Sequence, residues 1–562
     1  MALIHISANT LCKLSGLKAA QIEPTLTSLG IPLEGQEGDD LSLEITPNRP
    51  DWLSVEGVAR ACYCWRTAKP KTYKALPAKV HFSVDDSVQN IRPAFGTALV
   101  RDVAIDEEFL QSLIQLQEKL HDTLGRGRKK MAIGLHDIAA IEPPFTYKAV
   151  GREEVRFVPL GHSTPMTPNQ ILLEHDKGRA YAHLVGEKCP LIVDKDGDVL
   201  SFPPIINGER TRVSLSSRDL LIDCTGTSPD AVRITVKILC AALADRGGMV
   251  EEVFVNQKPY EIFKAQVLPF PLKEANKLLG LQLDAPALTR HLARMGHEVH
   301  GKNVHSPAWR SDMLGVVDLI EDIAISIGYN ELPMHLPSFG SVAQEQETHG
   351  TLHEAALGLG YFEAMSWILT SEAVLKKSKA SGPSLRVSNP LTEEFTTLRP
   401  WLYPNLLDIL AHSKSQPLPI YLYEVGPVEV PEGGPASAKA GDFMQYDHFC
   451  AAAMHPKSCF SETHARLQGI ASALGKTLTL VPQDIEGFIP GRCARVMVGE
   501  KKESAKADAP TVGVPPVSSP RFIGLIGEIH PSVLEAFGLE QPVALFELDT
   551  DALEEKTDKK KI

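Results

Sequence analysis

The chain has 562 residues, a formal net charge of −13, 43% hydrophobic residues and 23% charged residues. This length exceeds what one hydrophobic core usually supports, so we expect about four domains. The composition is ordinary for a globular protein, no apolar run approaches the ~20 residues that span a bilayer, and a net acidic chain is not a dedicated nucleic-acid wrapper. Nine cysteines without a C-x-x-C pair favour a reducing compartment, so we expect a cytoplasmic protein with no membrane partner.

The first predicted domain covers residues 1–75 and mixes strands with helices. Apolar spacing indicates a strand, a helix, a strand and a second helix, over residues 2–7, 8–15, 41–45 and 52–65. A proline-containing turn, residues 46–51, leads into the second helix. The basic stretch 69–79 is predicted to be a linker.

The second predicted domain, residues 80–264, alternates strands and helices. In its clearest unit, a strand at 219–223 runs into a turn at 224–227. Ser228 is then a suitable N-cap and Pro229 a suitable first helical residue, and a Gly-Gly pair ends the helix before a strand at 249–255. The backbone N–H groups of this turn lie at a helix N-terminus, where we expect them to be exposed and to favour negative charge. The alternative for the turn is simple helix capping, and for Asp223 it is a local Asx turn.

Histidines in this region do not indicate a Ser/His/Asp hydrolase, because the chain has no G-x-S-x-G sequence. His136, His162, His175 and His183 are therefore predicted to be ordinary surface or pocket-edge side chains. The basic segment RGRKK, residues 126–130, is the best local candidate for phosphate contacts, with solvated charge as the alternative.

The third predicted domain, residues 265–340, contains an acidic helix predicted over residues 312–327. Asp318, Glu321 and Asp322 have i, i+3, i+4 spacing and fall within an arc of about 100° on one helix face. Like charges at this spacing repel, and a bound cation would remove the repulsion. Oxygen ligands without Cys or suitably spaced His favour Mg²⁺ over zinc. Asp312 lies off this face and is suited to an N-cap, and the alternative for the whole pattern is a solvated acidic face.

Several segments, in order along the chain, resemble the β subunits of phenylalanyl-tRNA synthetases, in their shorter archaeal/eukaryotic form. They are ITPNRPD at 45–51, PPIINGE at 203–209, DCTGT at 223–227, PAWRSD at 307–312, and SNP at 388–390 with TLR at 397–399. The matches keep the order they have in the family, and the resemblance spans about residues 45–550, nearly the whole chain.

The resemblance implies an α+β multidomain fold. It comprises a B1-like N-terminal domain, a B3/B4-type editing domain, a small winged or helical B5-type domain, and a catalytically inactive class II synthetase-like antiparallel sheet domain over residues 341–562. In that last block, Pro427, Val428 and Glu429 stand where an active enzyme places an arginine against ATP. The resemblance therefore implies that ATP and phenylalanine bind to a separate α subunit.

The resemblance also implies site residues. Asp312, Asp318, Glu321 and Asp322 match the family's carboxylates for a Mg²⁺ ion shared with the α subunit. Through segments 203–209 and 223–227, the resemblance implies an editing pocket. Its polar residues would be Asp223, Thr225, Asn207 and Glu209, with Leu191 as an apolar wall. A positioned water, held by protein or by the tRNA terminus, is the expected nucleophile.

The function that the resemblance implies is attachment of phenylalanine to tRNA(Phe) by an α2β2 enzyme. This chain is expected to supply hydrolysis of mischarged Tyr-tRNA, tRNA contacts and assembly surfaces. Two alternatives are a free-standing editing esterase and a non-catalytic tRNA-binding scaffold.

Overall fold

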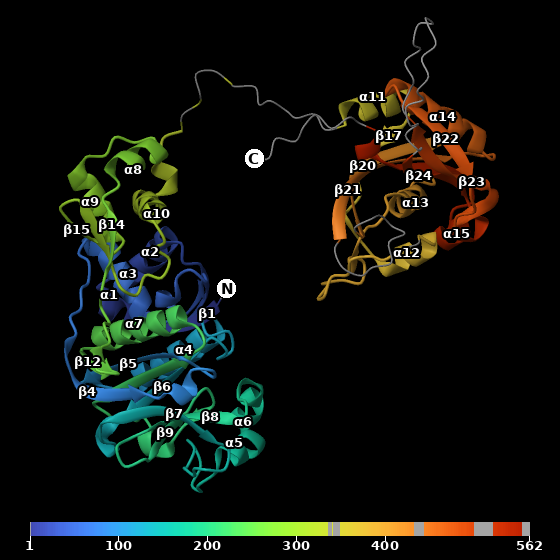
Figure 1. Cartoon of the computed structure of the whole chain (residues 1–562). Coiled ribbons are helices and arrows are strands. Elements are labelled where there is room, and N and C mark those ends of the chain that lie inside the picture. The colour runs from blue at the N-terminus through green and yellow to red at the C-terminus, as the bar shows by residue number, and fades with distance from the viewer. Residues whose placement is uncertain are drawn as a thin grey trace, which may run out of the picture. The chain divides into compact units, whose positions relative to one another are not determined.

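The chain folds into two compact units, residues 1–338 and 339–562 (Figure 1). The computed structural model describes residues 2–334, 336, 340, 349–380, 382–431, 443–499 and 521–553. Among these residues, no helix is both long enough and apolar enough to cross a membrane.

The N-terminal region of the first unit contains a three-stranded antiparallel sheet and three helices. The sheet has the order β1 (Ala2–Ser7), β3 (Asp40–Ile45), β2 (Leu33–Glu37). The helices are α1 (Ala8–Ser15), α2 (Ile22–Leu29) and α3 (Val55–Thr67). The predicted strand at 2–7 and helix at 8–15 are confirmed, and Ser7 caps α1 by accepting from the Thr10 N–H. The sequence reasoning missed α2 and β2.

A ten-stranded mixed sheet dominates the first unit. Nine of its strands follow the order β10, β9, β8, β7, β4, β12, β5, β11, β6, and β13 pairs with β12. Their bounds are β4 Leu76–Val84, β5 Ala94–Arg101, β6 Met131–Asp137, β7 Phe145–Gly151, β8 Lys188–Val193, β9 Val199–Phe202, β10 Ile206–Asn207, β11 Leu220–Gly226, β12 Met249–Val255 and β13 Lys258–Pro259. Because β4 pairs with β12 on one side and β7 on the other, the predicted linker at 69–79 is wrong at its C-terminal end.

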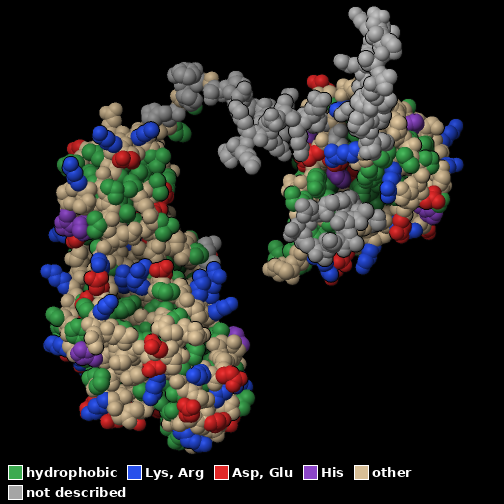
Figure 2. Space-filling view, in the orientation of Figure 1, with side chains coloured by type: hydrophobic (Ala, Val, Ile, Leu, Met, Phe, Trp, Pro, Cys, Tyr) green, Lys and Arg blue, Asp and Glu red, His purple; other side chains and the backbone are tan. Residues whose placement is uncertain are grey.

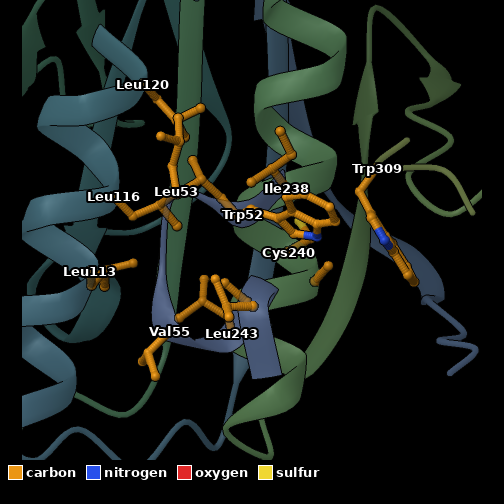
Figure 3. Close-up of a cluster of buried hydrophobic side chains, with 14 of the residues drawn as sticks. Trp52, Leu53, Val55, Leu113, Leu116, Leu120, Ile238, Cys240, Leu243 and Trp309 are labelled. Carbon is orange, nitrogen blue, oxygen red and sulfur yellow. The ribbon is translucent and has the colours of Figure 1, made fainter. Parts of the chain in front are cut away.

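Two helices, α4 (Glu107–Asp122) and α7 (Pro229–Asp245), bury their apolar sides in the same core as this sheet. Leu113, Leu116 and Leu120 of α4 meet Ile238, Cys240 and Leu243 of α7 in one cluster, as Figure 3 shows. Trp52 and Leu53 from the N-terminal region enter the same cluster, and so does Trp309. The first 70 residues therefore share a hydrophobic core with the large sheet. Helices α5 (Pro168–Glu174) and α6 (Asp176–Tyr181) cover a smaller core beside β8 and β9.

The C-terminal part of the first unit combines three helices with the sheet β14 (Gln266–Pro269), β16 (Asn303–Ser306), β15 (Glu298–His300). The helices are α8 (Leu272–Leu279), α9 (Ala285–Arg294) and α10 (Val316–Ile327). Helix α10 begins four residues later than predicted, with Gly315 as its N-cap. The prediction of Asp312 as the N-cap is therefore wrong.

The second unit is built on a seven-stranded sheet with the order β17, β20, β21, β25, β24, β23, β22, antiparallel except for the β17–β20 pair. The strands are β17 Phe362–Glu363, β20 Ile420–Pro431, β21 Phe443–Met454, β22 Thr477–Pro482, β23 Phe488–Gly499, β24 Arg521–Ile529 and β25 Val543–Asp549. A short pair, β18 (Leu369–Thr370) and β19 (Thr397–Leu398), lies outside it. One core contains α12 (Glu372–Ser378), α13 (Tyr403–His412) and α15 (Pro531–Phe537), and a second contains α11 (Gly350–Gly358) and α14 (Phe460–Ala473).

Candidate functional site

A buried polar triplet lies at the edge of the large sheet. The Asp223 carboxylate on β11 lies 2.6 Å from His136 Nε2 on β6, and His136 Nδ1 lies 2.8 Å from the Thr211 hydroxyl. All three side chains are almost fully buried. The histidine thus bridges a carboxylate and a hydroxyl, which fixes the position of both. The prediction of His136 as an ordinary surface or pocket-edge residue is wrong, because β6 pairs with β11 and brings it beside Asp223.

Gly134 makes room for this carboxylate. It stands opposite Asp223 in the β6–β11 register, and a Cβ at this position would lie 2.0 Å from Asp223 Oδ2 and 2.7 Å from His136 Nε2. Any side chain at residue 134 would therefore displace the carboxylate or the imidazole.

Asp223, one member of the triplet, lines a cavity of about 390 Å³, a size within the range of small-molecule sites. Its lining includes apolar and polar groups from several elements: Arg128, Gly134, Leu160, His175, Phe202, Pro204, Asn207 and Asp223. Asn207 is oriented by its side-chain amide, which donates to the Leu135 carbonyl at 3.1 Å. The structure thus brings two of the predicted pocket residues, Asp223 and Asn207, to one cavity.

The other predicted pocket residues do not line this cavity within the described part of the chain. The Thr225 side chain is fully buried and lies 3.4 Å from Arg92 Nε, while Glu209 accepts from the Gly161 N–H at 2.7 Å and from Arg212 at 3.1 Å. Leu191 is fully buried in the same hydrophobic cluster as Phe202, which does line the cavity. Leu191 therefore supports the wall from behind.

The backbone around residues 225–228 differs from the expectation of free amide donors. Thr225 and Gly226 belong to β11, where they pair with β5 and β6. The N–H groups of Thr227 and Ser228 both donate to the Lys130 carbonyl, at 3.0 and 3.3 Å. The expected donors for an ester carbonyl are thus already occupied. The local capping prediction is confirmed, because Ser228 accepts from the Ala231 N–H and Pro229 begins α7.

Arg128 is a lining residue that the sequence reasoning did not assign to the pocket. Its guanidinium donates to the carbonyls of Pro204 and Ile205 at 3.2 and 3.0 Å and to Glu118 at 3.1 Å. It also stacks over Tyr181, 4.4 Å from the ring centre. The side chain therefore ties the loop before β6 to the segment between β9 and β10. Its basic residue type was the only sequence signal.

In the acidic region near α10, an arginine occupies the centre. Arg310 is buried and binds Asp312 in a bidentate pair at 2.9 and 2.7 Å, and it binds Asp322 at 2.8 and 3.1 Å. Asp322 also lies 2.6 Å from His297 Nε2. Burial opposes charge on Asp322, but Arg310 and His297 hold its pKa well below the usual range. Two of the four predicted magnesium ligands therefore already share one cationic side chain of the same chain.

The other two predicted ligands face different partners. One oxygen of Asp318 accepts the N–H groups of Leu314 and Gly315, both at 2.7 Å, and Glu321 accepts from the Tyr329 hydroxyl. Across the described residues, no three His, Cys, Asp or Glu side chains converge as metal ligands. The four carboxylates therefore do not by themselves form a magnesium site in this fold.

In the second unit, Arg399 of the TLR segment is fully buried. Its Nη1 lies 2.6 Å from the Glu424 carboxylate and 2.7 Å from the Ser366 hydroxyl, and its Nε donates to the Pro427 carbonyl at 2.9 Å. This guanidinium is engaged within the protein and is not exposed to a ligand.

Comparisons with known proteins agree along the length of the chain. Residues 268–329 match a sequence model described as the tRNA synthetase B5 domain, and residues 330–550 match one described as the phenylalanyl tRNA synthetase beta chain CLM domain. The phenylalanine–tRNA ligase beta subunit of Archaeoglobus fulgidus is 35% identical over 98% of this chain and 98% of its own. That of Methanocorpusculum labreanum is 34% identical over 98% of both chains.

The chain belongs to the phenylalanyl-tRNA synthetase β-subunit family. It is a subunit of phenylalanine–tRNA ligase, which implies an α-subunit partner and tRNA. A solved N-terminal fragment of the β subunit from Pyrococcus horikoshii matches with a TM-score of 0.56 and 33% identity, covering 58% of this chain and 100% of that fragment. The predicted family and the mixed α+β architecture are thus confirmed. Ligases of this family use ATP and Mg²⁺, a property of the whole complex.

Proposed function

We propose that the cavity beside Asp223 is a hydrolytic editing site for Tyr-tRNA. The observation that carries this proposal is the Asp223–His136–Thr211 triplet, which holds a buried carboxylate at the border of an otherwise largely apolar cavity. Burying a carboxylate is costly unless partners such as these hold it. The presence of a carboxylate held in this way at a cavity therefore suits a role in hydrogen bonding to a ligand.

The chemistry follows from the difference between the two amino acids. A pocket for phenylalanine rejects tyrosine by only about 10²-fold, because tyrosine merely adds a hydroxyl. A second pocket with an acceptor for that hydroxyl selects tyrosine, and Asp223 and Asn207 offer side-chain oxygens. Water then attacks the ester carbonyl, the bond to the ribose oxygen breaks, and tyrosine and uncharged tRNA leave. His136 and Thr211 are positioning residues that hold Asp223.

The editing proposal is tested by Asp223→Ala in the complex with the α subunit. Tyr-tRNA should accumulate, while charging with phenylalanine stays near the wild-type rate. Thr225→Val is the comparison variant, because Thr225 was an expected pocket residue but does not line the cavity. If the Asp223→Ala variant cleared Tyr-tRNA as fast as the wild type, the assignment of the editing site to this cavity would be wrong.

We further propose that residues 341–562 form an inactive class II-like module that docks on the α subunit within a cytoplasmic α2β2 enzyme. Two observations support this. Arg399 is bound to Glu424 and is withheld from a triphosphate. The run that begins with β17 and continues to Trp367 exposes large apolar side chains, with Phe362 73%, Met365 93% and Trp367 76% accessible. The isolated chain should show no phenylalanine-dependent ATP–pyrophosphate exchange, and adding the α subunit should restore charging.

The predicted magnesium ion shared with the α subunit stays a prediction. Of its four carboxylates, only Asp318 and Glu321 lie outside the Arg310 cluster. If an ion binds at α10, any ligands in addition to Asp318 and Glu321 must therefore come from residues other than these four carboxylates.

A further inference from the structure

A second and larger hollow lies on another side of the first unit. It has a volume of about 960 Å³ and runs between the N-terminal half of α7 and residues 307–314. Five cationic side chains line it, namely Lys130, Arg233, Lys237, Lys264 and Arg310, the last of which is paired with Asp312 and Asp322. Figure 2 shows Lys and Arg side chains gathered at the level of α7. We call this hollow the α7 groove.

The side chains that line the α7 groove carry a net positive charge, whereas the chain as a whole is net negative. Its two lining carboxylates, Asp230 and Glu261, are paired with Arg233 at 2.7 Å and Lys264 at 2.9 Å. Among the described residues, neither Lys130 nor Lys237 forms an ion pair. Lys237 is half-buried one helical turn from Arg233, and burial together with Arg233 lowers its pKa. The repulsion between Lys237 and Arg233 is only partly offset by the nearby Glu261 carboxylate, and a bound anion relieves what remains.

The loop at residues 123–130 connects this groove with the cavity at Asp223. Lys130 lines the α7 groove, Arg126 and Lys130 line a neighbouring hollow of about 380 Å³, and Arg128 lines the cavity. The loop backbone turns through the left-handed region at Arg126, Gly127 and Arg128, with φ of 48°, 61° and 64°. This turn distributes successive basic side chains between the different hollows.

The loop is also held rigidly. Its ends close through the Lys130 N–H to the Gly125 carbonyl at 2.8 Å, and Arg92 donates to the carbonyls of Arg128 and Lys129 at 3.2 and 3.4 Å. The backbone of Gly226 is packed against it, because a Cβ there would lie 2.3 Å from the Lys130 carbonyl. A preorganised basic loop loses little conformational entropy when it binds a partner.

We propose that the α7 groove binds the sugar–phosphate backbone of tRNA and that the 123–130 loop guides its aminoacylated end to the cavity at Asp223. This inference rests on the proposed editing function for its destination, but the groove itself is tested independently. A polyanion suits a groove whose lining cations outnumber its carboxylates, and Lys130 of this groove belongs to the same loop as Arg128, which lines the cavity.

The test uses the double variant Lys130→Gln/Lys237→Gln in the complex with the α subunit. The backbone atoms of Lys130 hold the loop, so replacing its side chain leaves those hydrogen bonds intact. Lys258→Gln, an exposed lysine on β13, is the matched control. Binding of a tRNA(Phe) transcript is measured from low to moderate salt. Loss of two phosphate contacts should reduce the slope of log affinity against log salt by about 1.4 to 1.8.

A second measurement separates the groove from the chemistry. The double variant should show a raised KM for hydrolysis of Tyr-tRNA and an unchanged rate on the small ester tyrosyl-adenosine, which is too short to reach the groove. A wild-type salt slope in the double variant would overturn the groove proposal. If the wild-type complex hydrolysed neither ester, the editing proposal would fail while the salt slope would still decide the groove.

Discussion

At the scale of single residues, a few buried charged groups depend on partner side chains that packing brings beside them. Asp223 depends on His136, and Arg310 joins Asp312 to Asp322. In each case a buried charge without its partner is far more costly than the pair.

Gly134→Ala is expected to slow editing strongly without affecting charging. The new Cβ would lie 2.0 Å from Asp223 Oδ2 and would push the carboxylate from its place. A displacement of about 1 Å can cost roughly 10²-fold in rate. The measurement is Tyr-tRNA hydrolysis beside phenylalanine charging. Gly186→Ala is the control, since no atom lies within 4 Å of its Cβ position.

Arg310→Gln is expected to destabilise the first unit by about 3 to 5 kcal/mol, because it leaves the buried Asp322 and the partly buried Asp312 without a counter-charge. Urea unfolding of the isolated chain measures this loss. Because the carboxylates already have Arg310 as their cation, adding EDTA to the wild-type isolated chain should leave its unfolding midpoint unchanged. A marked drop with EDTA would show that a metal ion binds after all.

At the scale of elements, side chains from other strands fix where helices begin. Glu528 on β24 accepts the N–H groups of Cys459 and Phe460, at 2.9 and 3.2 Å, and so caps α14 from a distance. It also binds Arg492 at 2.7 Å. Burial by itself raises the pKa of Glu528, but hydrogen bonds from Ser458, Arg492 and these two amides outweigh it and lower the pKa below 4.5.

This cap predicts a pH-dependent contribution to the stability of the second unit. Because the folded-state pKa lies below the unfolded value, the contribution is fully present above about pH 4.5 and is lost as pH falls through the folded-state pKa. Glu528→Gln should cost about 1 to 3 kcal/mol at pH 7. Unfolding of both proteins at pH 7 and pH 3 measures the effect, and the difference should shrink at pH 3. A difference independent of pH would contradict the cap.

At the scale of the whole molecule, the second unit exposes a short run of large apolar side chains. Trp367 is 76% accessible, and two further large apolar side chains of the same short run, Phe362 and Met365, are also exposed. Large aromatic residues in a buried interface often carry much of the binding energy. We expect this surface to be covered in the complex with the α subunit.

Trp367→Glu should weaken association with the α subunit by roughly 30-fold or more, equivalent to about 2 kcal/mol. Analytical ultracentrifugation over a concentration series gives the dissociation constant. Val481→Glu, a half-exposed apolar position on β22, is the control for a general effect of surface charge. Equal association of the Trp367→Glu variant and the wild type would place the interface elsewhere.

The sequence alone determined the local features whose causes are local. The strand at 2–7, the helix at 8–15, the Ser228 cap with Pro229, and the strand at 249–255 follow from capping chemistry and apolar spacing within a few residues. The family was also identified from its ordered segments, and the comparisons confirm it.

Only the tertiary structure decided which distant groups meet. Pairing of β6 with β11 placed His136 on Asp223, and the same pairing buried Thr225. The N–H groups of residues 227–228 donate to the Lys130 carbonyl, and Arg310 forms an ion pair with Asp322 on α10. Spacing along a helix or strand fixes the direction of a side chain but not its partner, because the partner is set by strand register and packing between segments far apart in the sequence.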